Sequence, residues 1–177
     1  AGVPHPVTLA DYQHQISLGF VRDVIADIGD KKDVLVINGI NDRRTFAGKP
    51  GIGRVAAVPF IGVTGYALPL DVHVVDMLSL ADPIGSRMQI DGAGFAPGHE
   101  KPQPAAWIIA RFAAPSEQDD DAVTQARQRL LCPNVRAVLN AVEAAMNTRQ
   151  FFSNIAAAPR LTAVKLGSTT QLYSCGD

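Results

Sequence analysis

Apolar residues recur at spacings of three and four along the first part of the chain. This stripe consists of Leu9, Tyr12, Ile16, Phe20, Val24 and Ile28, and its period predicts one apolar face of a helix. Thr8 and Asp11 form a capping-box variant at its start, and Gly29 supplies a stop signal after it. We therefore expect a helix that ends at residue 28.

Three short apolar runs predict buried strands. They are residues 34–37 (VLVI), 72–75 (VHVV) and 107–110 (WIIA), continuous rather than alternating and mostly β-branched. Such runs are typical of strands buried on both faces of a parallel sheet that helices flank. Each run ends at a polar or small residue, and the carboxyl ends of such strands are where open α/β sheets bind ligands.

Two segments between these runs show no helical period and contain many glycines and prolines. Residues 39–70 and 89–104 are therefore expected to be long irregular insertions. Residues 55–70 carry no charge, but Pro59 and Pro69 interrupt them together with two glycines, which argues against a membrane-spanning helix.

The last third of the chain is predicted to be helical. Apolar stripes cover residues 119–131 and 133–146, and a third helix is expected from its cap at Thr148 to Pro159. Residues 161–164 and 171–174 are expected to be short strands. The whole pattern predicts an α/β fold, with a small, mostly parallel sheet flanked by helices, long irregular insertions and a helical C-terminal third. We expect a single domain over residues 1–177.

Composition and charge narrow the class of protein. Of 177 residues, 47% are hydrophobic and 19% are charged, which predicts a packed core. Sixteen basic and seventeen acidic side chains give a net charge of −1, so we expect no nucleic-acid partner. Ala1 stands first instead of Met, and we expect the natural chain to begin further upstream.

Few motifs indicate chemistry. The glycines of residues 51–56 match a loose dinucleotide pattern, but an ordinary glycine loop is expected because no strand leads directly into them. The histidines show no metal-ligand spacing and no nucleophile elbow occurs, so we expect no metal and no cofactor. Cys132 and Cys175 are either two unrelated buried thiols or a disulfide closing a loop of about 43 residues, which would need an oxidising compartment.

The most informative local feature follows the strand predicted at 72–75. A strand end carrying Asp76, a short helix capped by Asp82 and ending in Arg87, and a proline-stiffened loop with His99 and Lys101 follow one another in the sequence. These groups are suited to one anionic or polyhydroxylated ligand. The alternative is a set of solvated charges on loops.

The order of these motifs resembles a known family. The series is Asp76, Leu-x-Asp-Pro at 80–83, Arg87 and Gly-His-x-Lys at 98–101, supported by stretches at 4–12, 70–76, 132–140, 149–154 and 173–176. It is similar to the C-terminal extracytoplasmic domain of GT-C-class, polyprenyl-phosphate-dependent membrane glycosyltransferases, and more closely to the actinobacterial terminal β-(1→2)-arabinofuranosyltransferases.

The resemblance implies a function for the parent enzyme rather than for this chain alone. The enzyme would transfer arabinofuranose from decaprenyl-phosphate-arabinose to arabinan ends in arabinogalactan and lipoarabinomannan, with its catalytic acidic residue in an extracytoplasmic loop of its membrane domain. It implies no catalytic residue here, a Cys132–Cys175 disulfide, a place on the extracytoplasmic face, and a role for Arg87, His99 and Lys101 near the donor phosphate. Residues 55–70 are expected to pack on the membrane domain or the bilayer surface.

Two other functions stay open at this point. One is a carbohydrate-binding module that acts independently of a membrane domain. The other is a small standalone α/β enzyme.

Overall fold

The computed structural model describes most of the chain, in two compact units. The units comprise residues 1–75 and 76–177. The residues that the structure describes are 20–39, 42–89, 101, 103–167 and 175.

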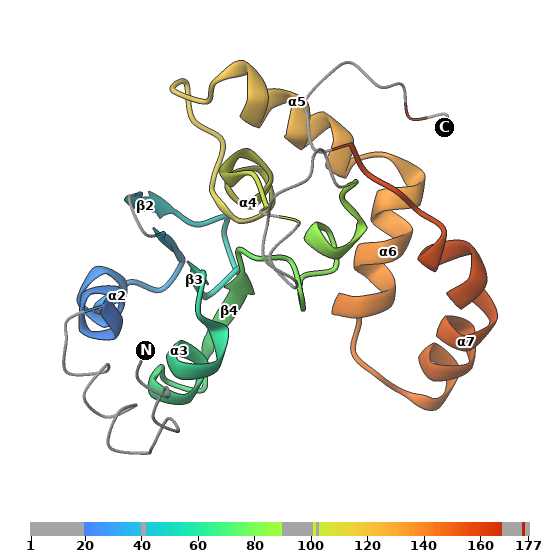
Figure 1. Cartoon of the computed structure of the whole chain (residues 1–177), viewed down its shortest axis with the longest axis horizontal. Coiled ribbons are helices and arrows are strands. Elements are labelled where there is room, and N and C mark those ends of the chain that lie inside the picture. Colours follow the sequence, from blue (N-terminus) through green and yellow to red (C-terminus); the bar gives the residue numbers. More distant parts are fainter. Residues whose placement is uncertain (1–19, 40–41, 90–100, 102, 168–174, 176–177) are drawn as a thin grey trace, which may run out of the picture. The chain divides into compact units, whose positions relative to one another are not determined.

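The first unit contains a four-stranded mixed sheet and two helices (Figure 1). The strands lie in the order β2-β1-β3-β4, and β1 pairs antiparallel with β2 and parallel with β3. This confirms the α/β class and the strands predicted at 34–37 and 72–75. The elements are α2 (Phe20–Ile28), β1 (Val34–Asn38), β2 (Arg43–Ala47), β3 (Arg54–Val58), α3 (Ile61–Ala67) and β4 (Val72–Asp76).

The core of the first unit lies between one face of this sheet and the two helices. Alternate residues of β1 and β3 share one face of a sheet, and here they pack with the apolar side of α2 and the end of α3. All five residues of β1 are buried, which explains its continuous apolar pattern. The cluster consists of Val21, Val24, Ile28, Val34, Val36, Ala56, Val58, Leu68 and Val72.

The end of α2 falls where the sequence predicted it. Gly29 has a φ of +50° and donates its N–H to the carbonyl of Ile25, a helix stop that favours glycine. The predicted beginning of this helix, residues 9–19, lies outside the described residues.

The prediction of an irregular insertion over residues 39–70 was wrong. This segment supplies β2, β3 and α3. β2 is an exposed edge strand whose polar residues carry no apolar period, so only its pairing with β1 reveals it. β3 is a core strand, and residues 55–58 are therefore buried in this unit instead of facing a membrane.

The second unit is helical, as predicted for the C-terminal third. It contains the 3₁₀ turn η1 (Gly85–Arg87) and the helices α4 (Ala105–Phe112), α5 (Asp121–Leu130), α6 (Pro133–Glu143) and α7 (Thr148–Thr162). Helices that follow one another pack in pairs, α4 with α5, α5 with α6, and α6 with α7.

The strand predicted at residues 107–110 is instead the middle of α4. All residues from Trp107 to Phe112 are buried, so this short helix has no polar face from which a helical period could be recognised. A short apolar run is compatible with either element for that reason. Pro104 at the N-cap is the local signal that favoured the helix.

The predicted end of α7 was also wrong. The helix runs through Pro159 to Thr162, and its cap is Asn147, whose side chain accepts the N–H of Gln150. The strand expected at 161–164 is therefore the last turn of α7 and its continuation. Proline removes one main-chain donor, a loss tolerated on this exposed helix. The strand expected at 171–174 lies outside the described residues.

Candidate functional site

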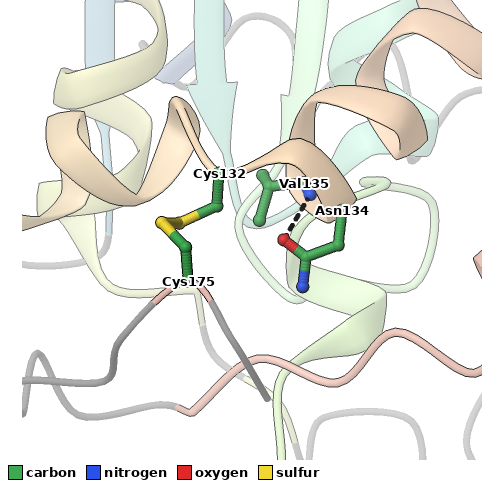
Figure 2. The surroundings of a disulfide bond; sticks show 4 residues. All are labelled: Cys132, Asn134, Val135 and Cys175. Atoms are coloured by element: carbon green, nitrogen blue, oxygen red, sulfur yellow. Dashed lines mark hydrogen bonds between the residues drawn. A yellow bond between two sulfur atoms is a disulfide. The ribbon is translucent and has the colours of Figure 1, made fainter.

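A disulfide ties the C-terminal segment to the start of α6 (Figure 2). The sulfur atoms of Cys132 and Cys175 are 2.04 Å apart, and 43 residues separate the two positions. Cys132 is the N-cap of α6, and within its first turn the Asn134 side chain accepts the N–H of Val135 at 2.8 Å. The predicted pairing is confirmed.

Asp76 organises the turn that follows β4. Its carboxylate is buried and accepts main-chain N–H bonds from Leu78, Leu80 and Ala81 at 2.7–2.9 Å. Ser79, inside this turn, adopts a φ of +67°. Three donors satisfy a carboxylate that would otherwise be costly to bury, so the side chain holds the loop in place.

Asp82 has a similar position at the start of η1. One carboxylate oxygen accepts the N–H groups of Ile84 and Gly85 at 2.9 Å. The prediction of Asp82 as N-cap and Pro83 as first helical residue was wrong in its position, because η1 begins at Gly85 and its N-cap is Ile84. Asp82 instead holds the turn that leads into η1. Its other carboxylate oxygen accepts a bond from the buried Arg111 at 2.8 Å. Arg111 also donates to Glu143 of α6 at 2.7 Å, so this ion-pair network joins η1, α4 and α6.

Arg87 and Lys101 line the same depression near η1. The Arg87 guanidinium donates through Nε to the carbonyl of Leu161 and through Nη1 to that of Pro83, at 3.1 and 2.8 Å. The Lys101 ammonium donates to the carbonyl of Ser86 at 2.9 Å. These bonds leave the Arg87 Nη2 protons and two Lys101 protons without a partner among the described residues.

Main-chain pairing brings another segment to the same place. The Gln89 N–H donates to the carbonyl of Leu166, and the Leu166 N–H donates to that of Arg87, both at 2.8 Å. This parallel bridge between Met88 and Leu166 buries both side chains. It also places Lys165, whose side chain is exposed, beside η1.

Two depressions beside this bridge share Gln89, Val164 and Lys165 in their linings. One, of about 500 Å³, is lined by Arg87, Lys101 and Lys165, and the other, of about 440 Å³, also includes Lys165. We call the two together the cationic groove. In the described part of the chain no carboxylate lines it, whereas five basic side chains do: Arg87, Lys101, Arg129, Arg160 and Lys165.

The structure thus brings together two of the five residues singled out from the sequence. Arg87 and Lys101 line the groove, whereas Asp76 and Asp82 do not and have their carboxylates occupied by the protein itself. His99 lies outside the described residues.

Sequence reasoning missed three of the groove's cations, Arg129, Arg160 and Lys165. A signal for two of them was present in the sequence. From residue 131 to residue 167 there are four basic side chains, including Arg160 and Lys165, and one carboxylate, Glu143. In a chain of nearly balanced charge, such a local excess indicates a surface suited to anions.

A second arginine network holds α4 and α5 together. The Arg127 guanidinium donates to Asp119 at 2.8 Å and to the carbonyls of Ala110, Ala113 and Ala114 at the end of α4. This hydrogen bond from Arg127 holds the pKa of the Asp119 carboxyl below its usual value. A cation at the C-terminus of a helix is also favourable for its dipole.

The described residues contain no group of three or more His, Cys, Asp or Glu side chains placed to hold a metal ion. Among the same residues, none of the helices has both the length and the apolar character needed to cross a bilayer.

The fold and the groove define an α/β protein whose helical unit offers a surface suited to anionic ligands. The sequence profile of the AftB family C-terminal domain matches residues 52–168, more than half of the chain. The chain therefore belongs to this family, as the resemblance predicted.

Two curated relatives carry the name terminal β-(1→2)-arabinofuranosyltransferase. The protein of Mycobacterium tuberculosis strain H37Rv is 28% identical over 198 aligned residues, which cover 99% of this chain and 31% of that protein. The protein of Corynebacterium glutamicum is 30% identical over 101 residues, covering 54% of this chain and 14% of that protein. The chain thus spans less than a third of the length of either relative. No solved structure gives a significant match.

Proposed function

We propose that this chain is the C-terminal domain of a GT-C-class membrane arabinofuranosyltransferase and that its cationic groove binds the phosphate of the lipid-linked donor. The enzyme would move arabinofuranose from decaprenyl-phosphate-arabinose to the ends of arabinan. The observation that carries the role of the groove is its lining by five basic side chains, with no carboxylate in the described part.

The chemistry of the donor matches this lining. A polyprenyl phosphodiester carries one negative charge and presents two oxygens as hydrogen-bond acceptors, for which Arg and Lys are the strongest partners. Lys165 and Lys101 would supply ammonium protons, and Arg87 would supply its Nη2 protons. Asp76 and Asp82 act in this proposal as positioning residues, because their carboxylates hold the turns that carry Arg87. His99 stays a candidate by its place in the sequence.

This chain is not proposed to perform the transfer step. The catalytic acidic residue would lie in an extracytoplasmic loop of the membrane domain of the same enzyme, and no residue of this chain is assigned to the transfer step. The disulfide supports a place on the extracytoplasmic face, since such bonds persist in oxidising compartments.

The two alternative functions have less support. Sugar-binding modules use exposed aromatic rings, but no aromatic side chain of the described residues lines the groove, and Trp107 is buried in α4. An independent binding module would require the 177-residue chain to bind arabinan oligosaccharides. A standalone enzyme would require the same chain to turn over an arabinosyl substrate.

The proposal is tested in the full-length enzyme with a double substitution, Lys101→Gln with Lys165→Gln. We expect the KM for decaprenyl-phosphate-arabinose to rise at least ~10-fold with little change in kcat, because the lost contacts bind the donor before and during transfer alike. Arg136→Gln is the matched control, since Arg136 is an exposed cation of α6 outside the groove. A donor KM that stays unchanged in a folded double variant would refute the proposal.

A measurement on the 177-residue chain separates recognition of the phosphate from binding of the isoprenoid tail. Farnesyl phosphate, farnesol and inorganic phosphate are titrated against the isotope-labelled chain. We expect farnesyl phosphate to shift the resonances of Lys101 and Lys165, and farnesol to leave them in place. Shifts with farnesol alone would contradict a site built for phosphate.

A further inference from the structure

Helix α7 exposes apolar side chains and turns polar ones inward, the reverse of the pattern expected for a helix that only covers a core. Residues 150, 154, 157 and 161 follow a helical spacing and form the buried or half-buried face, with Gln150 and Asn154 among them. Phe151, Phe152 and Ile155 lie on the opposite side, with 51%, 63% and 55% of their surfaces exposed. We call these three residues the α7 apolar face. A surface helix normally buries its apolar stripe and exposes its polar one.

The contact between α6 and α7 explains the inversion. The Gln150 side chain donates to Asn154 at 2.8 Å, and Asn154 donates to the carbonyl of Ala141 in α6 at 2.8 Å. Polar side chains thus hold α7 against α6, which lies beside it in Figure 1. Val142 of α6 and Met146 of the loop before α7 are also exposed apolar residues, at 57% and 63%. Exposed apolar residues thus occur in α6, in the loop after it and in α7.

The charged side chains of α7 itself are both basic. α7 contains Arg149 and Arg160 and no carboxylate. The two arginines are eleven residues apart, close to three helical turns, so they lie along the same side of the helix beside the α7 apolar face. Glu143 is the one carboxylate from residue 131 to residue 167, and the buried Arg111 already pairs with it.

We propose that the α7 apolar face is a membrane-binding surface that inserts into the headgroup region of an anionic phospholipid bilayer. A helix of this kind lies in the plane of the interface, with aromatic side chains at the acyl boundary and basic side chains at the lipid phosphates. The one-sided positive charge matches an anionic lipid surface. None of the three residues of this face lines the cationic groove, and Arg160 is the one residue that belongs to both proposals.

The test measures flotation of the 177-residue chain with vesicles. Vesicles of phosphatidylcholine with phosphatidylglycerol are compared with vesicles of phosphatidylcholine alone. We expect the chain to float with the anionic vesicles, and to bind less as the salt concentration rises. Phe151→Ser with Phe152→Ser should weaken binding at least ~10-fold, because two half-exposed rings no longer enter the interface.

The matched control is Phe60→Ser in the first unit. Phe60 is the same residue type with 54% exposure, and it lies in the 55–70 stretch that the sequence had suggested as the membrane contact. We expect this variant to bind vesicles like the unchanged chain. Arg149→Gln, outside the groove, should weaken binding to anionic vesicles and reduce its salt dependence.

Several outcomes would overturn this proposal. The unchanged chain could fail to float with anionic vesicles, or Phe60→Ser could lose binding as strongly as the double α7 variant. A dimer that dissociates in the α7 variant, with no vesicle binding, would assign the face to a second copy of the chain. Failure of the vesicle experiment would leave the proposed function of the cationic groove intact, because that function is tested by the donor KM of the Lys101 and Lys165 variants.

Discussion

Replacing Asp82 by asparagine tests whether the buried ion pair with Arg111 holds the helical unit together. The substitution keeps the shape of the side chain and one oxygen that can accept the N–H groups of Ile84 and Gly85. It replaces the other oxygen, which faces the Arg111 guanidinium at 2.8 Å, by an amide that cannot accept. Glu143 is then the remaining carboxylate partner of Arg111 among the described residues.

The magnitude follows from burial. The side chains of Asp82 and Arg111 are 3% and 6% exposed, so the interaction is little screened by solvent. A hydrogen bond to a charged group contributes about 1.5–3 kcal/mol, and breaking a buried pair costs about 3–5 kcal/mol. Because Glu143 still faces the guanidinium, we expect a loss of about 3 kcal/mol. That corresponds to roughly 6–12 °C in Tm for a chain of this size.

The assay uses the single tryptophan of the chain. Trp107 is buried in α4, one helical turn before Arg111, so its fluorescence reports unfolding of the second unit. Urea unfolding of the Asp82→Asn variant should show a midpoint lowered by about 1.5 M, taking a slope of about 2 kcal/mol per M. A signal from this unit is needed because the chain has two units and one transition cannot be assumed for both.

Two comparisons decide whether the reasoning is right. Glu143→Gln should cost less than about 1 kcal/mol, because its side chain is 49% exposed and water screens the pair. In an Arg111→Met background, Asp82→Asn should lower the free energy of unfolding much less than in the original chain, because the Asp82 carboxylate no longer has the Arg111 guanidinium as its partner. A loss below about 1 kcal/mol for Asp82→Asn, or one equal to that of Glu143→Gln, would refute the assigned role.

Three further predictions concern other parts of the chain. Because the folded-state pKa of Asp119 is lowered, its ionised carboxylate stabilises the fold at pH values above the ordinary Asp pKa, and this stabilisation is lost as pH falls through the folded-state pKa. The urea midpoint of Asp119→Asn should therefore decrease less than that of the unchanged chain as the pH is lowered below about 5. Reduction of the disulfide, or Cys175→Ser, should cost roughly 4 kcal/mol by the chain-entropy estimate for a loop of 43 residues, and an unchanged Tm would contradict this. Gly48→Ala should lower the stability of the first unit by about 1–3 kcal/mol, because a Cβ would lie 2.7 Å from the main-chain nitrogen of Val34. Gly62→Ala in α3 is its control, with open space around the added carbon, and circular dichroism melts should show it unchanged or slightly stabilised.

Much of the fold was predictable because burial leaves a direct trace in the sequence. The run at 34–37 is apolar at every position because β1 is buried on both faces. Pro133 at the start of α6 and Gly29 at the end of α2 were recognisable because each residue's backbone preference matches its position.

The elements that were missed depend on neighbours that the local sequence does not specify. β2 is polar and exposed, and its strand conformation comes from pairing with β1 and from the bidentate bond between Arg43 and Asp27, at 2.7 and 2.9 Å. α4 is buried around its whole circumference, so it offers no period. In both cases tertiary contacts override the local pattern.

The same distinction between local pattern and long-range contact explains which residues of the candidate site were predicted. Arg87 and Lys101 were found because they lie within a run of motifs that follow one strand. Lys165 was missed because only a main-chain bridge between Met88 and Leu166, residues far apart in the sequence, carries it to the groove. Such a contact has no local signature.

This bridge links the stability of the Asp82 network to the proposed binding of the donor. Asp82 fixes the turn at Ile84 and Gly85, that turn leads into η1, and η1 ends at Arg87, whose carbonyl accepts the N–H of Leu166. Lys165 therefore keeps its place only while the turn is intact. A folded Asp82→Ala enzyme, which lacks the oxygen that accepts the Ile84 and Gly85 N–H groups, should then show a raised donor KM, although Asp82 itself does not line the groove. Adding Lys165→Gln should raise that KM by less than it does in the unchanged enzyme, because two substitutions that act on one contact are not additive. Fully additive effects of the two substitutions on the donor KM would refute the proposal that the Asp82 network positions Lys165 in the groove.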